Sequence, residues 1–204
     1  MYNLVKPLSI RENLLKRNIR IFSNHEFTRI FELSTYQSEY ELRLLMKEGL
    51  LARLKKGYYI LKTDPPSEEE IANALYKPSY LSFEYALAYY NLIPEMTYQI
   101  TSATTKPTRI FTTNNTAFSY YTIKREAYTG YKMAQRGERQ FYIADPEKAF
   151  VDYLYLISLG QRVIAGGRSL NDRLDSRSLN KSNIRTYVKL YDWSKLDQLV
   201  EKIS

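Results

Sequence analysis

The chain is 204 residues long and carries 30 Lys and Arg against 22 Asp and Glu, a formal net charge of +8. This length allows one large or two small domains, each with a buried core, and the charge favours a polyanionic partner over an acidic or neutral one. The absence of cysteine excludes disulfides, thiol nucleophiles and cysteine-bound metals. No apolar run approaches the ~18 residues of a membrane span, so we expect a soluble cytoplasmic protein.

Capping boxes mark the helix starts of the N-terminal region. In each box a serine hydroxyl and the side chain three residues later satisfy backbone N–H groups that a helix start leaves free. The boxes are Ser9 with Glu12, Ser23 with Glu26, and Ser34 with Gln37. They predict helices over residues 10–17, 24–31 and 35–48, with a short strand around residues 19–22 after the first helix.

A hairpin with a basic tip follows the third predicted helix. Gly49 ends that helix, at a position where a positive φ angle is wanted. Two short strands, residues 51–54 and 58–61, then flank the turn Lys55-Lys56-Gly57. The order helix, strand, helix, helix and two-stranded wing predicts a winged helix-turn-helix domain over residues 1–63.

The third predicted helix has one basic and aromatic face. Leu42 and Leu45 turn toward the core, while Glu41 and Glu48 fall on a third face that a phosphate backbone would repel. Residues 1–63 hold 12 Lys and Arg against 6 Asp and Glu, so we predict double-stranded DNA as the partner, with the wing as the stronger contact. The predicted DNA-binding residues are Tyr36, Tyr40, Arg43, Lys47, Arg53, Lys55 and Lys56. The alternative is a winged helix that contacts only proteins, with these charges as a solvated face.

A second domain is expected over residues 67–204, after a linker at residues 63–66 that contains two prolines. Ser67 with Glu70, Ser82, and Asp145 before Pro146 mark three helix starts. Between the last two, four segments rich in Thr, Tyr, Ile and Phe predict strands: TYQITSATT, TRIFTT, AFSYYTIK and RQFYIA. The helix after Pro146 is apolar nearly all round and should be the central core helix. The predicted fold class is α+β, with an antiparallel-rich sheet in the second domain and C-terminal helices.

A second basic stretch begins at about residue 160. Residues 160–189 hold 7 Lys and Arg against 2 Asp and Glu, and two helices, over residues 183–190 and 194–203, close the chain. The stretch either extends a nucleic-acid footprint or is a solvated loop with basic helix faces, and both interpretations stay open. Its candidate residues are Arg162, Arg168, Arg173, Arg177, Lys181, Arg185 and Lys189.

Catalytic signatures are missing from the sequence. It has no phosphate-binding glycine loop, dinucleotide fingerprint, nucleophile elbow or zinc-protease motif, and its single histidine, His25, follows a helix cap without an evident catalytic partner. Asp145, Glu147 and Lys148 faintly resemble a metal-dependent nuclease set, although helix capping accounts better for them. We therefore expect no catalytic residues, metal or cofactor. The many tyrosines of the second domain should pack in its core rather than stack on bases.

Three segments resemble the AbiEi family of antitoxins from type IV toxin–antitoxin, or abortive-infection, systems. They are GLLARLKKGYYIL, PSYLSFEYALAYYNLIPEMTYQITSATTKPTRIF and IADPEKAFVDYLYL. The resemblance extends over residues 10–160, and its most specific parts are the wing, the pattern P-S-Y-x-S-x-x-x-A-L from Pro78 to Leu87, and P-E-K-A from Pro146 to Ala149.

The resemblance implies two functions. The winged helix would bind inverted repeats in the promoter of its own operon and repress it. The second domain would counteract a nucleotidyltransferase-type toxin without forming a stable complex with it. From the residues alone only DNA binding is indicated. Two alternatives remain: a plain winged-helix regulator whose second domain binds a ligand or partner, and a metal-dependent nuclease. The oligomeric state is also open, either a monomer or weak dimer that pairs on DNA.

Overall fold

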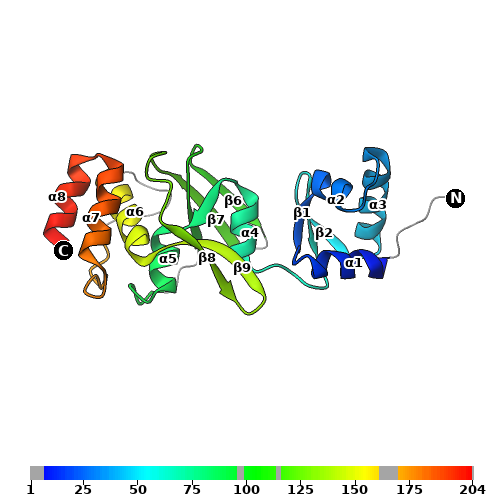
Figure 1. Cartoon of the computed structure of the whole chain (residues 1–204), viewed down its shortest axis with the longest axis horizontal. Helices are drawn as coiled ribbons and strands as arrows, with labels where there is room; N and C mark the ends of the chain where they lie inside the picture. Colours follow the sequence, from blue (N-terminus) through cyan, green and yellow to red (C-terminus); the bar gives the residue numbers. More distant parts are fainter. Residues whose placement is uncertain (1–6, 96–98, 114–115, 161–169, 204) are drawn as a thin grey trace. The chain divides into compact units, whose positions relative to one another are not determined.

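The computed structural model describes residues 7–95, 99–113, 116–160 and 170–203. The protein is α+β, as predicted, and divides into two compact units, Met1–Leu75 and Tyr76–Ser204 (Figure 1). The division falls one helix later than the proline-containing segment at residues 63–66. Among the described helices, none is long and apolar enough to span a membrane.

Unit 1 has a winged helix-turn-helix-like arrangement. Three helices pack on a three-stranded antiparallel sheet of order β1-β3-β2, around a core that includes Phe22, Phe27, Leu42 and Leu45. The predicted order of elements is confirmed, and a fourth helix follows the sheet. The elements are α1 (Pro7–Lys16), β1 (Ile21–Ser23), α2 (Asn24–Ile30), α3 (Thr35–Lys47), β2 (Leu51–Lys55), β3 (Tyr58–Leu61) and α4 (Glu68–Leu75).

Local capping explains most helix starts in unit 1. The boxes that begin with Ser23 and Ser34 are both fully formed. The Ser67 N–H donates to the Glu70 carboxylate at 2.8 Å, and the Glu70 N–H donates to the Ser67 hydroxyl at 3.2 Å. The Ser9 prediction is wrong, because α1 already begins at Pro7 and Ser9 lies inside the helix. Proline suits the first turn of a helix, where its missing N–H has no partner to lose.

Unit 2 is built on a six-stranded mixed sheet of order β6-β7-β5-β4-β9-β8. The pairs β5–β7 and β4–β9 are parallel, whereas β4–β5, β6–β7 and β8–β9 are antiparallel. The sequence did not predict β4, which is short, or β8, which is too polar to show an apolar alternation. The strands are β4 (Ser79–Leu81), β5 (Gln99–Thr104), β6 (Arg109–Thr113), β7 (Thr116–Thr122), β8 (Tyr131–Arg136) and β9 (Arg139–Ala144).

The helices of unit 2 gather around α6 (Pro146–Ser158), which is buried along most of its length. It packs against α5 (Phe83–Tyr89), α7 (Lys181–Tyr191) and α8 (Ser194–Ile203), and α7 and α8 lie side by side (Figure 1). Ser82 and Asp145 occupy the predicted N-cap positions, but neither side chain makes a capping hydrogen bond. Instead, the Ser82 hydroxyl donates a hydrogen bond to Asp152, and Asp145 forms an ion pair with Lys132.

Candidate nucleic-acid interface

The exposed face of α3 carries four of the predicted residues. Tyr36 is 75% exposed and Tyr40 is 50% exposed, and Arg43 and Lys47 are also exposed. These positions follow one another at helical spacing, so the four side chains form one stripe. The opposite face is fixed in the core by Leu42 and Leu45. The helix therefore presents two aromatic rings and two cations to solvent from a rigid support.

The corner between α2 and α3 is held by short-range polar contacts. Glu32 adopts a positive φ of 52°, and the Leu33 N–H donates to the Thr28 carbonyl at 3.1 Å. The Thr28 hydroxyl also donates to the Ser38 hydroxyl at 2.8 Å, which ties the two helices together. A fixed corner of this kind is what a helix-turn-helix needs to hold its second helix in a DNA groove.

The three predicted DNA-binding cations of the wing differ in exposure. Arg53 and Lys56 are exposed, and Arg53 lies directly across from Tyr59 in the β2–β3 ladder, next to a bulge. Lys55 is partly buried: its ammonium donates to the Leu75 carbonyl at the C-terminus of α4 and lies 4.2 Å from the centroid of the Tyr58 ring. A lysine there satisfies a helix-end carbonyl. Lys55 thus anchors α4, whereas Arg53 and Lys56 are exposed to solvent.

The prediction that Glu41 lies on an exposed acidic face of α3 is wrong, because its side chain is buried and only 7% of the residue is exposed. Its Oε2 atom has no hydrogen-bond partner, and burial, followed by the charge of Glu48, raises the pKa of its carboxyl group. Glu39 and Glu48 remain exposed. The helix therefore repels phosphate less than its sequence indicates, because one of its three glutamates faces away from solvent.

A cation–aromatic cluster in unit 2 was missed by the sequence analysis. Lys106 lies 5.4 Å and Arg109 5.9 Å from the centroid of the Tyr76 ring, and Arg109 also lies 5.4 Å from that of Phe111. Both cations are exposed. In the sequence only the segment KPTR indicated them, and the cluster was not predicted because Lys106 and Arg109 lie 30 and 33 residues from Tyr76. Cations held on rings in this way suit a phosphate backbone.

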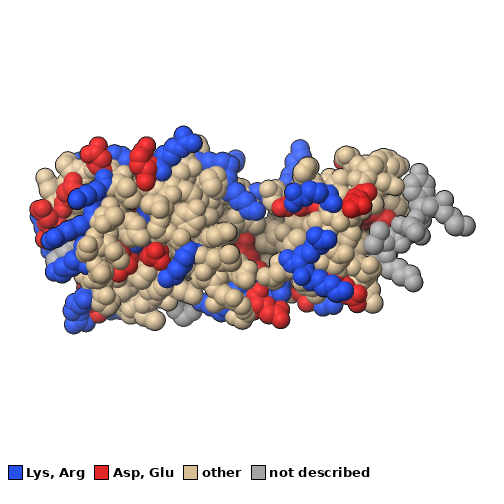
Figure 2. All heavy atoms as spheres, viewed as in Figure 1, with Lys and Arg blue, Asp and Glu red and all other residues tan. Residues whose placement is uncertain are grey.

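Two arginines of the predicted second basic surface form ion pairs with neighbouring carboxylates. Arg162 and Arg168 lie outside the described residues. Arg173 lies 3.5 Å from a Glu95 carboxylate oxygen, and Arg177 binds Asp175 at 2.8 Å, with the Asp175 pKa lowered to about 2 mainly by that contact. The mixture of signs is also visible over the surface, where acidic groups lie among the cations (Figure 2).

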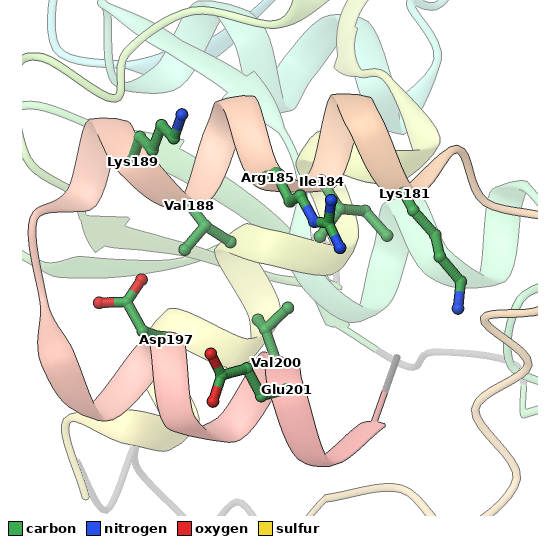
Figure 3. A pocket seen from close by; sticks show the side chains of 8 residues that line it. All are labelled: Lys181, Ile184, Arg185, Val188, Lys189, Asp197, Val200 and Glu201. Atoms are coloured by element: carbon green, nitrogen blue, oxygen red, sulfur yellow. The ribbon is translucent and has the colours of Figure 1, made fainter.

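The remaining members of that basic set lie on α7, along a groove shared with α8 (Figure 3). Lys181, Arg185 and Lys189 recur every four residues on α7, and Asp197 and Glu201 line the same groove from α8 (Figure 3). The cavity measures about 430 Å³ and is also lined by Ile184, Val188 and Val200. Because one wall is cationic and the other anionic, the groove does not give the one-sided positive potential that a polyanion favours.

Asp145, Glu147 and Lys148, which resemble a nuclease set in the sequence, do not converge on one site. The Asp145 carboxylate pairs with Lys132 at 3.2 Å, the Glu147 carboxylate accepts from the Asn180 N–H at 3.0 Å, and Lys148 points into the core. Among the described residues, no group of three potential metal-ligating His, Cys, Asp or Glu side chains occurs. The arrangement gives no support to metal-dependent cleavage at these positions.

A closed polar network occupies the centre of unit 2. Asp152 accepts hydrogen bonds from Ser82 at 2.7 Å and Tyr80 at 3.1 Å, as well as from Lys148 and Tyr191. All five residues are fully buried, so burial raises the pKa of both tyrosines and lowers that of Lys148, against the opposing charge of Asp152. Without access to solvent, these groups join β4, α6 and α7 rather than forming a reactive site.

The tyrosines of unit 2 that the sequence offered for base stacking are mostly buried or partly buried, and the partly buried ones are Tyr85, Tyr89, Tyr90 and Tyr128. Tyr120, Tyr121, Tyr153 and Tyr155 are buried, and Tyr98 lies outside the described residues. The exposed exceptions are Tyr131 and Tyr142, on β8 and β9.

A scan against models of known protein families matches none, and a search of curated proteins finds no match.

Proposed function

We propose that the protein is a DNA-binding transcriptional regulator that uses α3 and the β2–β3 wing. The observation that carries the proposal is the exposed stripe of Tyr36, Tyr40, Arg43 and Lys47 on the second helix of the helix-turn-helix. Helix side chains of this kind reach base edges in a major groove, and the wing cations Arg53 and Lys56 are suited to the flanking phosphates.

The resemblance to AbiEi proteins extends this proposal. The protein would repress its own operon at inverted repeats, and unit 2 would act as the antitoxin against a nucleotidyltransferase-type toxin, without a stable complex. A neighbouring reading frame of that type, whose toxicity is relieved when the full chain is co-expressed, would support this half. Continued growth arrest in the presence of the full chain would contradict it.

The DNA-binding half is tested by the salt dependence of binding to the upstream DNA. Log K falls as log salt rises, and each lost phosphate contact makes this slope less steep by about 0.9. The double variant Arg53→Ala with Lys56→Ala should therefore make the slope less steep by about 2. Tyr36→Ala should instead reduce the preference for the upstream DNA over a scrambled duplex by about tenfold, or ~1.4 kcal/mol. Anisotropy titrations of labelled duplexes measure both quantities.

Lys202→Ala is the matched control, because it removes an exposed cation from α8 in unit 2. It should leave the preference for the upstream DNA unchanged. If the wing double variant binds DNA with the same affinity and salt slope as the unmodified chain, the assignment of the wing is wrong.

A further inference from the structure

The β8–β9 ribbon of unit 2 carries an exposed apolar patch. Met133 is 56% exposed, Tyr142 is 45% exposed and Tyr131 is 37% exposed. Met133 and Tyr142 lie directly opposite each other in the ladder, and the centroids of the Tyr131 and Tyr142 rings are 5.9 Å apart. Large apolar side chains gathered on one exposed face mark an interaction surface more often than scattered ones do.

The patch is rigidly supported from below. The Tyr131 ring stacks on the Tyr80 ring with centroids 4.6 Å apart and planes 13° apart. Tyr80 is fully buried and donates to Asp152 at 3.1 Å. The exposed rings are therefore held in place before any partner arrives, which reduces the entropy lost on binding.

Among the strands that the structure describes, β8 is terminal in the sheet order β6-β7-β5-β4-β9-β8, so the ribbon lies at the end of that sheet. Gly137 and Glu138 form the turn between paired Arg136 and Arg139. With this register, the alternation of an antiparallel ladder directs the backbone groups of residues 131, 133 and 135 toward the open edge. The 2.8 Å hydrogen bond from the Asp145 N–H to the Gly130 carbonyl agrees with that alternation. An open edge of this kind is a template for another strand.

Charge decides which strand can pair there. The side chains of Lys132 and Arg136 lie on the sheet face opposite the patch. Both are exposed, although Lys132 also lies 3.2 Å from Asp145 and Arg136 lies 5.4 Å from the centroid of the Tyr89 ring. In a symmetric antiparallel pairing of two copies centred on Ala134, which keeps the patches on one face, Lys132 of one copy faces Arg136 of the other, twice. Like charges directly opposite each other destabilise a pair of strands. This register is therefore unfavourable for a second copy, whereas a strand with acidic side chains on that face is attracted to the exposed Arg136 and to the exposed Lys132, whose charge Asp145 offsets only in part.

We propose that β8 binds an extended segment of a partner protein by strand addition, and that this segment alternates apolar with acidic side chains. Its apolar side chains cover Tyr131 and Met133, and its carboxylates face Lys132 and Arg136. The site is distinct from the proposed DNA interface, and the proposal does not depend on DNA binding.

The test uses the full chain and two labelled seven-residue probe peptides, one alternating valine with glutamate and the other valine with lysine. The glutamate peptide should bind at least tenfold more tightly in anisotropy titrations, and it should slow amide exchange at residues 131, 133 and 135. Met133→Ser with Tyr142→Ser should weaken binding at least tenfold. Gln135→Pro should do the same, because it removes an N–H from the open edge.

Leu8→Ser is the matched control, since it removes an exposed apolar side chain from α1 and should leave binding intact. Arg136→Glu should shift the preference toward the lysine peptide, with circular dichroism verifying that each variant is folded. Equal binding of both peptides, or protection away from β8, would overturn the proposal. Slowed exchange at β8 that depends on protein concentration without peptide would overturn it in favour of a second copy.

Discussion

Lys55 and Lys56 are neighbours in the chain, yet their surroundings give them different roles. Lys55 is tied to the Leu75 carbonyl and the Tyr58 ring, whereas Lys56 is exposed at the tip of the wing. Glu41 and Glu39 differ in the same way on α3, since Glu41 is buried and Glu39 is exposed. At the scale of single residues, charge alone does not identify a DNA contact, because exposure decides which charges a ligand can reach.

Glu41 predicts a specific pH dependence of stability. Burial raises its pKa in the folded protein, so the folded state binds this proton more tightly than the unfolded chain does. The associated stability is fully present below the ordinary glutamate pKa of about 4.3, and it is lost as the pH rises through the raised value.

Glu41→Gln should therefore stabilise the protein at pH 7, with the gain shrinking as the pH falls toward about 4. Urea unfolding across that range measures the effect. Glu39→Gln is the matched exposed control and should change stability little. A gain from Glu41→Gln that is independent of pH would show that loss of its charge is not the cause.

At the scale of elements, β4, α6 and α7 are joined by the buried cluster around Asp152. Tyr80 and Ser82 reach it from β4 and the start of α5, and Tyr191 reaches it from the end of α7. A buried charge pair contributes little net stability, but the loss of one partner leaves the other charge unpaired in the core. The cluster thus makes the packing of α7 depend on one carboxylate of α6.

Asp152→Ala should destabilise unit 2 by about 3–5 kcal/mol, because Lys148 is then buried without a counter-charge. Tyr191→Phe removes a single hydroxyl and should cost only about 1–2 kcal/mol. The double variant Lys148→Met with Asp152→Ala should be less destabilised than the sum of its single changes, which a double-mutant cycle in urea would measure. Strict additivity would mean that the two side chains do not depend on each other.

At the scale of the whole molecule, the two units differ in charge. Residues 1–75 hold 12 Lys and Arg against 10 Asp and Glu, whereas residues 76–204 hold 18 against 12. The acidic α4 lowers the net charge of unit 1, so any DNA affinity there must come from local placement of cations rather than from bulk charge. Each unit also has its own core, and the single tryptophan, Trp193, belongs to unit 2.

The separate cores predict separable unfolding, followed by tryptophan fluorescence for unit 2 and by far-ultraviolet circular dichroism for both units. Leu45→Ala, in the core of unit 1, should cost about 2–5 kcal/mol and should shift part of the dichroism transition while leaving the fluorescence midpoint unchanged. Phe150→Ala, in α6 of unit 2, should lower the fluorescence midpoint. If Leu45→Ala also shifts the fluorescence midpoint, the two units unfold as one.

Local sequence patterns predict the helix starts at Ser23, Ser34 and Ser67, the order of elements in unit 1, and the central position of α6. Those features depend on residues only a few positions apart, or on a period that a single helix carries. Tertiary structure alone decided the burial of Glu41, the engagement of Lys55, the diversion of Ser82 and Asp145 from capping, and the open strand β8. The partners of Asp152 show why: Tyr80, Ser82 and Tyr191 lie 72, 70 and 39 positions away in the chain. Such contacts form only when segments distant in the chain pack together, so a local sequence pattern does not predict which polar groups will pair.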